Sequence, residues 1–468
     1  MSDPTARPLR RISSWKVFGL FCLFSFLFLL GVVFVPWDIR PVEAPDLELK
    51  IPEIAPADNA FTWFEKAGKA VVTKLPDNPD GSPRDWTVDL TGRIGASCEK
   101  WDPILATEGL AANAAVFPDF ERGLSCQHYV APRCESDRMH FTWLKKHEKL
   151  LTLLLCLKSK QLQLAGDPAA AAKPALQAFR LGKMILDSSN GETEWFVGIA
   201  CESIALRRLE ELIADANTPD SALMEIQAAL DQWNPQGFAD GCKNTMRGQY
   251  QCKVQTIKEI LDGSYRVEPA EIRVARYVPY LLKPNMMNRG MAAFYRHQIA
   301  SVDLPFSKLT SDYPGKLKYP DASMMGRLEG WTKPNSEGLI FFSDEIYYMG
   351  EELSPLHKKF HIQVYISALR LKIAVRLYEN RHGQLPDDLS ALVPEFMKEI
   401  PNDPYADKPF HYSKEKKLLW SVGADGIDDG GKCEPIDIMY PYGRGRDAVM
   451  PLGTRELKPN LAPKPSGP

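Results

Sequence analysis

The sequence predicts a mainly α-helical protein with an N-terminal transmembrane helix, an array of antiparallel helical hairpins and a small α+β module near its C-terminal end. Three features support this fold class. Residues 17–35 are apolar and uncharged, residues 58–300 carry hydrophobic patterns of period 3.6, and residues 355–442 change from one long helical pattern to short strand-like runs. A chain of 468 residues with 44% hydrophobic content can form two or three domains with sizeable cores.

The apolar run Val17–Val35 contains 19 residues and no charge. At ~1.5 Å per residue, a helix of this run measures roughly 28 Å, about the thickness of the hydrocarbon core of a bilayer. Basic residues precede the run and acidic residues dominate after it, so we expect a cytoplasmic tail at 1–16, a single transmembrane helix at 17–36 and a body outside the cytoplasm. The alternative is a cleaved signal peptide ending near Ala44, although the apolar core of such peptides is usually ~7–15 residues long.

Composition narrows the choice of partners. A net charge of −3, with 57 basic and 60 acidic residues, argues against nucleic acid as an obligatory partner. Eight cysteines lie outside the apolar run, and an extracytoplasmic compartment allows them to form disulfides. Cys126 and Cys134 are the best local pair. The alternative is that several cysteines are buried small hydrophobic residues.

The middle of the chain is predicted to form helices joined by short turns. A proline-rich, acidic tether occupies residues 37–57, and Asp58 is a candidate cap for the helix that follows. Later helices are expected at 104–117, 140–165, 169–187, 192–215, 221–233 and 241–261. We therefore predict a helical-hairpin domain over 58–300, similar to tetratricopeptide-type solenoids but without their full repeat signature. Residues 301–354 have little periodicity and are expected to form an irregular linker.

The C-terminal module combines a helix with a hairpin. A long helix is expected from Pro355 to Arg381, with Gly383 just beyond its end. The runs 410–412 and 418–422 are strand-like, and an acidic, glycine-rich loop follows them. Residues 443–468 are rich in proline and charge, so we expect a flexible tail there.

The order of these motifs resembles the C-terminal half of the major pseudopilin of the type II secretion system over residues 360–440. The motifs that carry the resemblance are Tyr378 with Gly383-x-Leu385-Pro386, Pro401-Asn-Asp-Pro404 and Ser421-Val-Gly-Ala-Asp-Gly426. The whole chain also resembles membrane-anchored proteins of unknown function from planctomycete- and verrucomicrobium-type bacteria, in which a phrase like Asp58-Asn-Ala-Phe61 follows the anchor. These resemblances imply a bacterial inner (cytoplasmic) membrane, with the body on its periplasmic side. The chain differs from pseudopilins at Trp15-Lys-Val-Phe-Gly-Leu, where it has no prepilin-peptidase site.

The pseudopilin resemblance implies a calcium site, because this loop region binds calcium in pseudopilins. Asp425 matches the aspartate of the Asp-Gly motif, Asp437 matches a later aspartate, and Asp428 and Asp429 belong to a variant with two aspartates. Calcium prefers several hard oxygen ligands, which a tight glycine loop can supply. The spacing does not fit an EF-hand, and a solvated acidic turn is the alternative.

Other motifs leave two classes of function open. His357 and His361 stand four residues apart on one helix, but the glutamate of an HExxH zinc motif is missing, so a solvated or packed pair is favoured. The favoured function is a non-catalytic scaffold that binds a protein partner, its helical array offering a concave surface. The alternative is an extracytoplasmic hydrolase with a carboxylate site between the helical body and the C-terminal module. A cleft lined by carboxylates or histidines with shifted pKa values would favour the hydrolase.

Overall fold

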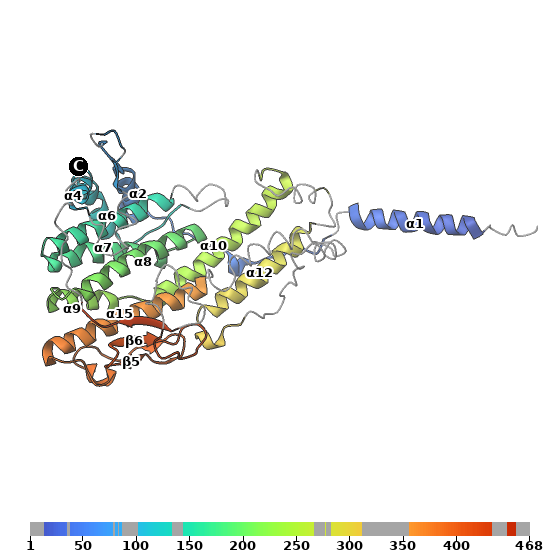
Figure 1. Cartoon of the computed structure of the whole chain (residues 1–468). Coiled ribbons are helices and arrows are strands. Elements are labelled where there is room, and N and C mark those ends of the chain that lie inside the picture. Colours follow the sequence, from blue (N-terminus) through green and yellow to red (C-terminus); the bar gives the residue numbers. More distant parts are fainter. Residues whose placement is uncertain are drawn as a thin grey trace, which may run out of the picture. The chain divides into compact units, whose positions relative to one another are not determined.

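The computed structural model describes residues 14–34, 38–77, 80–82, 84–86, 102–132, 144–265, 277, 282–310, 355–432 and 447–454. Over these residues the chain is mainly helical with a small sheet component (Figure 1), which confirms the predicted fold class at this level. The chain divides into two compact units. Unit 1 comprises residues 1–44, 254–294 and 314–348, and unit 2 comprises residues 45–253, 295–313 and 349–468.

Unit 1 contains helix α1 (Ser14–Phe34), whose described side chains from 18 to 28 are all exposed. Among the described residues, no helix is both long enough and apolar enough to cross a membrane. The chain after α1 contacts the first turn of α12 (Pro284–Ser301). The amide of Asn285 donates to the carboxylate of Asp38 at 2.7 Å, and the Asn285 side chain donates to the Ile39 carbonyl at 2.8 Å. A carboxylate at a helix N-terminus interacts favourably with the helix dipole.

Unit 2 holds most of the described helices. They are α2 (Ala60–Lys69), α4 (Pro103–Ala112), α5 (Val116–Ser125), α6 (Leu144–Leu164), α7 (Pro168–Asp187), α8 (Glu192–Ala214), α9 (Asp220–Asp231) and α15 (Pro355–His382). Two further helices, α10 (Pro235–Asp262) and α12, have residues in both units. Short 3₁₀ turns lie at Pro45–Leu47, Pro56–Asp58, Phe306–Lys308 and Leu389–Leu392.

Helices α6, α7 and α8 pack side by side and supply much of the core of unit 2 (Figure 1). The connection between α6 and α7 is short because Gly166 adopts φ +88° and Asp167 caps α7, accepting from the Ala170 amide at 2.9 Å. Such a short link makes consecutive helices antiparallel neighbours, as expected for a helical hairpin. The core here is aliphatic and includes Leu181, Ile185, Leu206 and Leu209, each with no exposed surface.

The backbone of α10, in its N-terminal half, lies directly against the backbone at the end of α7. A Cβ added at Gly241 would lie 1.8 Å from the Leu186 carbonyl oxygen, and one added at Gly248 would lie 1.9 Å from the Asn190 carbonyl oxygen. Any larger residue at either position would require a backbone to move, so this contact depends on the two glycines.

The C-terminal part of unit 2 is built on α15. Its short strands are β3 (Asn402–Asp403), β4 (Lys408–Pro409), β5 (His411–Ser413), β6 (Leu418–Ser421) and β7 (Ala448–Pro451), in addition to β1 (Lys74–Leu75) and β2 (Arg84–Asp85) near α4. The predicted hairpin is confirmed, since β5 and β6 pair antiparallel with His411 opposite Trp420. Strand β7 adds to the other edge of β6, with Val449 opposite Trp420. Residues 448–451, expected in a flexible tail, are therefore part of the sheet.

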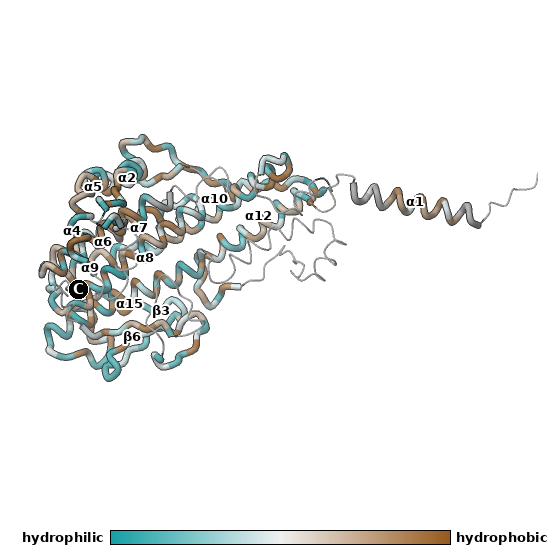
Figure 2. The backbone as a smooth tube through the Cα atoms, turned by 45° about the horizontal axis from the view of Figure 1, so that its top comes forward, coloured by the Kyte–Doolittle hydropathy of each residue, from teal (hydrophilic) through white to brown (hydrophobic). Residues whose placement is uncertain are grey.

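Helix α15 is fixed to the helical array through buried polar contacts. Arg376, only 5% exposed, donates hydrogen bonds to the carbonyls of Ile213, Ala216 and Thr218, just where α8 ends. Carbonyls at the C-terminal end of a helix have no N–H donor within the helix, and the Arg376 guanidinium supplies the missing hydrogen bonds. Polar and apolar residues mix along α15 in Figure 2. Within unit 2, the C-terminal module is therefore packed onto α8 and α9.

Two local expectations for the helices are wrong. The expected helix 104–117 is two helices, because the side chain of Asn113 turns back at the end of α4 to donate to the Gly109 carbonyl at 2.8 Å. The same side chain also accepts from the Val72 amide at 2.8 Å. The cap of α2 is Asn59 and not Asp58, since Asn59 Oδ1 accepts from the Phe61 amide at 3.1 Å.

Candidate functional site

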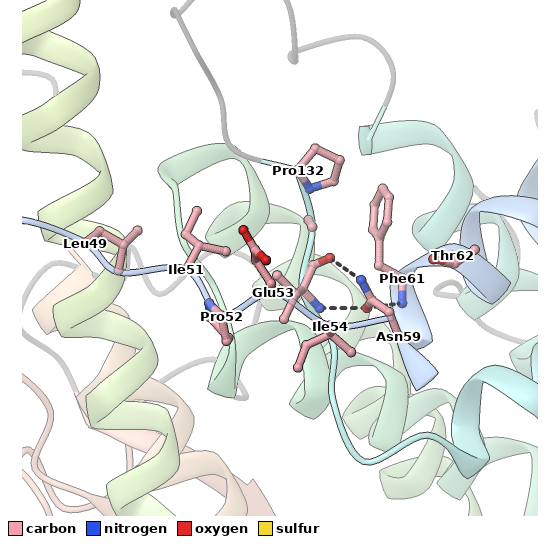
Figure 3. A pocket seen from close by; sticks show the side chains of 11 residues that line it. Leu49, Ile51, Pro52, Glu53, Ile54, Asn59, Phe61, Thr62 and Pro132 are labelled. Carbon is pink, nitrogen blue, oxygen red and sulfur yellow. Dashed lines mark hydrogen bonds between the residues drawn. The ribbon is translucent and has the colours of Figure 1, made fainter. Parts of the chain in front are cut away.

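A surface depression of about 660 Å³ lies beside the start of α2 in unit 2. One wall is the segment 49–54, which belongs to the expected tether, and the other is the segment 130–132 (Figure 3). Phe61 and Thr62 of α2 complete the lining. The site is open to solvent and consists largely of apolar side chains and prolines.

Asn59 joins the two walls. Its side-chain amide donates to the Val130 carbonyl at 2.8 Å, and its side-chain oxygen accepts from the Val130 amide at 2.9 Å (Figure 3). The Ala60 amide also donates to the His128 carbonyl at 2.8 Å. One asparagine therefore reproduces the pairing of a neighbouring strand while it caps α2.

Aromatic packing supports the floor of the depression. Tyr129 is 2% exposed, and its ring meets that of Phe61 edge to face at 5.9 Å and lies 6.3 Å from that of Phe64. Edge-to-face pairs of this kind add to the energy of burial. The backbone around Val130 is thus held by aromatic side chains as well as by Asn59.

The segment 49–54 is fixed at its other end by Asp46. The guanidinium of Arg296 donates two hydrogen bonds to the carboxylate of Asp46, both at 2.7 Å. The contact lowers the pKa of Asp46, chiefly through the hydrogen bond from Arg296. Leu47 and Leu49 are buried beside it. The wall of the depression is therefore attached to the body at both ends.

The carboxylates with strongly shifted pKa values lie elsewhere, inside the helical array. Burial raises the pKa of Glu148 to about 7 and that of Glu202 to about 8, and these residues are 1% and 0% exposed. Burial also raises the pKa of Asp187, which accepts a hydrogen bond from Lys183 and whose charge raises the pKa of Glu202 further. None of these acids lines the depression, whose described lining contains Glu53 as its single charged residue.

The structure places three of the four aspartates of the expected calcium site in one loop after β6. Asp425 and Asp429 are exposed, and Asp428 accepts from the Trp420 indole at 2.9 Å and from the Gly430 amide at 2.9 Å. The hydrogen bond from Trp420 is the largest cause of a lowered pKa at Asp428. Asp437 lies outside the described residues. Among those described, no three acidic, histidine or cysteine side chains are grouped as a metal site requires.

Asp447 organises this loop, although sequence reasoning did not single it out. It is 3% exposed and accepts from the amides of Asp429 at 3.2 Å and Gly431 at 2.7 Å.

Asp403 has a similar role before the hairpin. It has no exposed surface and accepts from the Tyr405 amide, the Ser421 hydroxyl and the Val422 amide at 3.0, 2.8 and 2.9 Å. Burial raises the pKa of Asp403 in spite of these donors.

The remaining candidates are buried or partly buried side chains. His361 is 6% exposed, and the ring of His357 lies 5.9 Å from that of Phe306, which agrees with a packed pair. Cys126, expected to pair with Cys134, carries a free thiol, and Cys134 lies outside the described residues.

Sequence reasoning also missed the role of Asn59, although it noted the phrase in which Asn59 stands. Residue type alone does not distinguish Asn59 from Asp58, because Asn and Asp are equally favoured as N-caps. What distinguishes Asn59 is its pairing with Val130, which lies 71 residues further along the chain. Comparison of the chain with protein-family models, with curated proteins and with solved structures finds no match.

Proposed function

We propose that the protein is a membrane-anchored, extracytoplasmic interaction protein without catalytic activity, which binds a protein partner at the depression beside α2. The observation that carries the proposal is the chemistry of that depression. Its described lining offers mainly apolar side chains and prolines, with Asn59 and Thr62 as neutral polar residues and Glu53 as the single titratable one, whereas acid–base hydrolysis needs at least two groups that exchange protons or attack the substrate.

The positions of the titratable groups support the same conclusion. Glu148 and Glu202 hold raised pKa values because they are buried, and neither of them lines the depression. A raised pKa indicates a functional site only when the group lines a cleft, since buried structural groups shift in the same way. The hydrolase alternative therefore has no support from the described residues.

The anchor is proposed from the sequence and from α1. The uncharged run Val17–Val35 is long enough to span a bilayer, and α1 covers nearly all of it. Phe21 and Phe28 are 68% and 73% exposed, and a continuous apolar surface of this kind is unusual in water. The basic residues before Val17 favour a cytoplasmic N-terminus by the positive-inside rule. An alkaline phosphatase fusion after Asp58 should therefore be active in a bacterial host, and an inactive fusion would reverse the orientation.

The binding function can be tested by photo-crosslinking in native membranes. A photoreactive amino acid at Thr62, which lines the depression, should form an adduct with a partner protein, whereas the same amino acid at the exposed Glu225 of α9 serves as the matched control. The proposal fails if Thr62 yields no adduct, or no more adduct than Glu225 does.

A further inference from the structure

The wall 51–55 has the properties of an unpaired strand edge. In Figure 3 the side chains of Ile51 and Glu53 point to one side and those of Pro52 and Ile54 to the other, which is the alternation of an extended strand. Ala55, with φ −58° and ψ 138°, is close to polyproline II geometry and ends the segment before the 3₁₀ turn Pro56–Asp58. Extended backbone of this kind can pair with a second strand if its N–H and C=O groups are free.

Only one edge of this segment keeps all of its N–H groups. Successive residues of a strand present their backbone groups to opposite edges, so residues 51, 53 and 55 share one edge and residues 52, 54 and 56 share the other. Pro52 and Pro56 have no N–H, which interrupts the second edge. Among the described residues, the backbone groups of Ile51 and Glu53 make no hydrogen bond. The Ala55 carbonyl accepts from the Asp58 amide at 2.9 Å, so the free groups of the first edge are those of Ile51 and Glu53 together with the N–H of Ala55.

The side chains next to this edge define what it would accept. Ile51 and Glu53 point to the same side as Phe61 and Pro132 (Figure 3). Apolar surface therefore surrounds one exposed carboxylate, and Glu53 is the only charged residue in the described lining. A partner strand gains most by placing a basic residue opposite Glu53 and apolar residues two positions away on either side, because these side chains share a face.

We propose that the edge formed by Ile51, Glu53 and the N–H of Ala55 binds an extended segment of a partner protein by strand addition, with a lysine or arginine opposite Glu53 and apolar residues flanking it at alternate positions. This inference rests on the proposed binding function and names the class of partner. Backbone pairing would supply affinity, and the alternating side chains would supply specificity. Attachment of the wall at Asp46 and Asn59 reduces the ordering cost of binding, because the edge is already extended.

The test uses the full chain in detergent and a fluorescein-labelled heptapeptide, Thr-Val-Thr-Lys-Thr-Val-Thr, with the glutamate version of the same peptide as its control. Fluorescence anisotropy should show saturable binding of the lysine peptide and at least fivefold weaker binding of the glutamate peptide. The variant Glu53→Lys should reverse this preference. Glu48→Lys changes the same charge in the same segment, outside the depression, and should leave the preference as it is.

Backbone pairing is tested separately with two N-methylated versions of the lysine peptide. One carries N-methyl groups on its even-numbered residues and the other on its odd-numbered residues, so each blocks one edge of the peptide. Pairing along one edge predicts that one version loses binding and the other keeps it. Equal binding of both versions would show that the side chains alone are recognised and would overturn strand addition.

Lack of binding by the lysine peptide up to about 1 mM, or a preference that Glu53→Lys leaves unchanged, would also overturn the inference. These results would leave the proposed function standing if Thr62 still crosslinks to a partner in native membranes. Loss of both the crosslink and the peptide binding would remove the proposed function as well.

Discussion

Glu202 of α8 accepts a hydrogen bond from the indole nitrogen of Trp233 at 3.2 Å, and Glu202 has no exposed surface. The second carboxylate oxygen of Glu202 has no partner among the described residues. Asp187 lies near enough to raise the pKa of Glu202 further, while Lys183 and the Trp233 hydrogen bond lower it. Burial dominates, so this acid keeps its proton at neutral pH.

Stability should therefore fall as the pH rises. The unfolded chain releases the proton of Glu202 near its ordinary pKa of 4.5, whereas the folded protein holds it to about pH 8. The protonated Glu202 therefore contributes its full stabilisation below about pH 4.5, and this contribution is lost as the pH rises to about 8. The corresponding change in the free energy of unfolding is up to about 5 kcal/mol. Glu202→Gln should melt at a higher temperature than the wild type at pH 9 and near the same temperature at pH 5.

The control for this prediction is Glu225→Gln on the exposed face of α9. The test is to measure the thermal midpoints of the wild type, Glu202→Gln and Glu225→Gln at pH 5, 7 and 9. A gap between Glu202→Gln and the wild type that stays constant with pH would mean that Glu202 is ionised in the folded protein. Glu148 changes stability in the same direction, since burial also raises its pKa, and Glu148→Gln should add to the effect.

Asn59→Ala should destabilise α2 and separate the walls of the depression. The substitution removes the cap on Phe61 and both hydrogen bonds to Val130, for which we expect a loss of about 2–4 kcal/mol. Asp58→Ala should cost less than about 0.5 kcal/mol, because Asp58 is exposed and does not cap α2. Urea denaturation gives both values, and hydrogen exchange should accelerate at the Phe61 and Val130 amides in Asn59→Ala alone. Equal losses for the two variants would contradict the assignment of the cap.

Arg376→Met should be among the most destabilising substitutions in α15. It leaves the carbonyls at the end of α8 without a donor in the interior, at a cost of about 3–5 kcal/mol. Arg370 is the matched control on the same helix. Its ion pair with Asp231 at 2.6 Å is partly exposed, so Arg370→Met should cost at most about 1 kcal/mol. Similar thermal shifts for the two variants would mean that α15 is not fixed to α8 through Arg376.

The acidic loop gives a prediction that separates the metal from the hydrogen bonds. A calcium site at Asp425, Asp428, Asp429 and Asp437 predicts a higher melting temperature in millimolar calcium than in chelator, and Asp425→Ala should abolish that difference. Asp447→Ala should lower the melting temperature in both buffers, since it leaves two backbone amides of the loop without their acceptor. Superimposed wild-type curves would remove the calcium site and leave Asp447 as the residue that holds the loop.

The helices of unit 2 could be predicted because their signals are local. Asp167 with Pro168 marks the start of α7, Gly383 follows α15, and the strand patterns on either side of the turn at 414–417 give the hairpin. In each case the residues that determine the element lie within a few positions of it.

Features that depend on distant partners could not be predicted. The strand β7 is only four residues long, and its polar, proline-rich surroundings resemble a tail until β6 is known to lie beside it. Likewise, the acidic segment after α1 suggests a free tether, because the sequence gives no sign that Arg296 will bind Asp46. The depression itself forms between segments that are separated by more than 70 positions along the chain.

The same separation sets an order of events during synthesis. Ribosomes add ~5–20 residues per second, so the 71 residues from Asn59 to Val130 take roughly 4–14 s to appear. Throughout that interval the first wall of the depression is present without the second. The nascent chain thus exposes the Ile51–Ala55 segment before Asn59 can pair with Val130, and a chaperone that recognises extended apolar segments would meet this segment before the intended partner does.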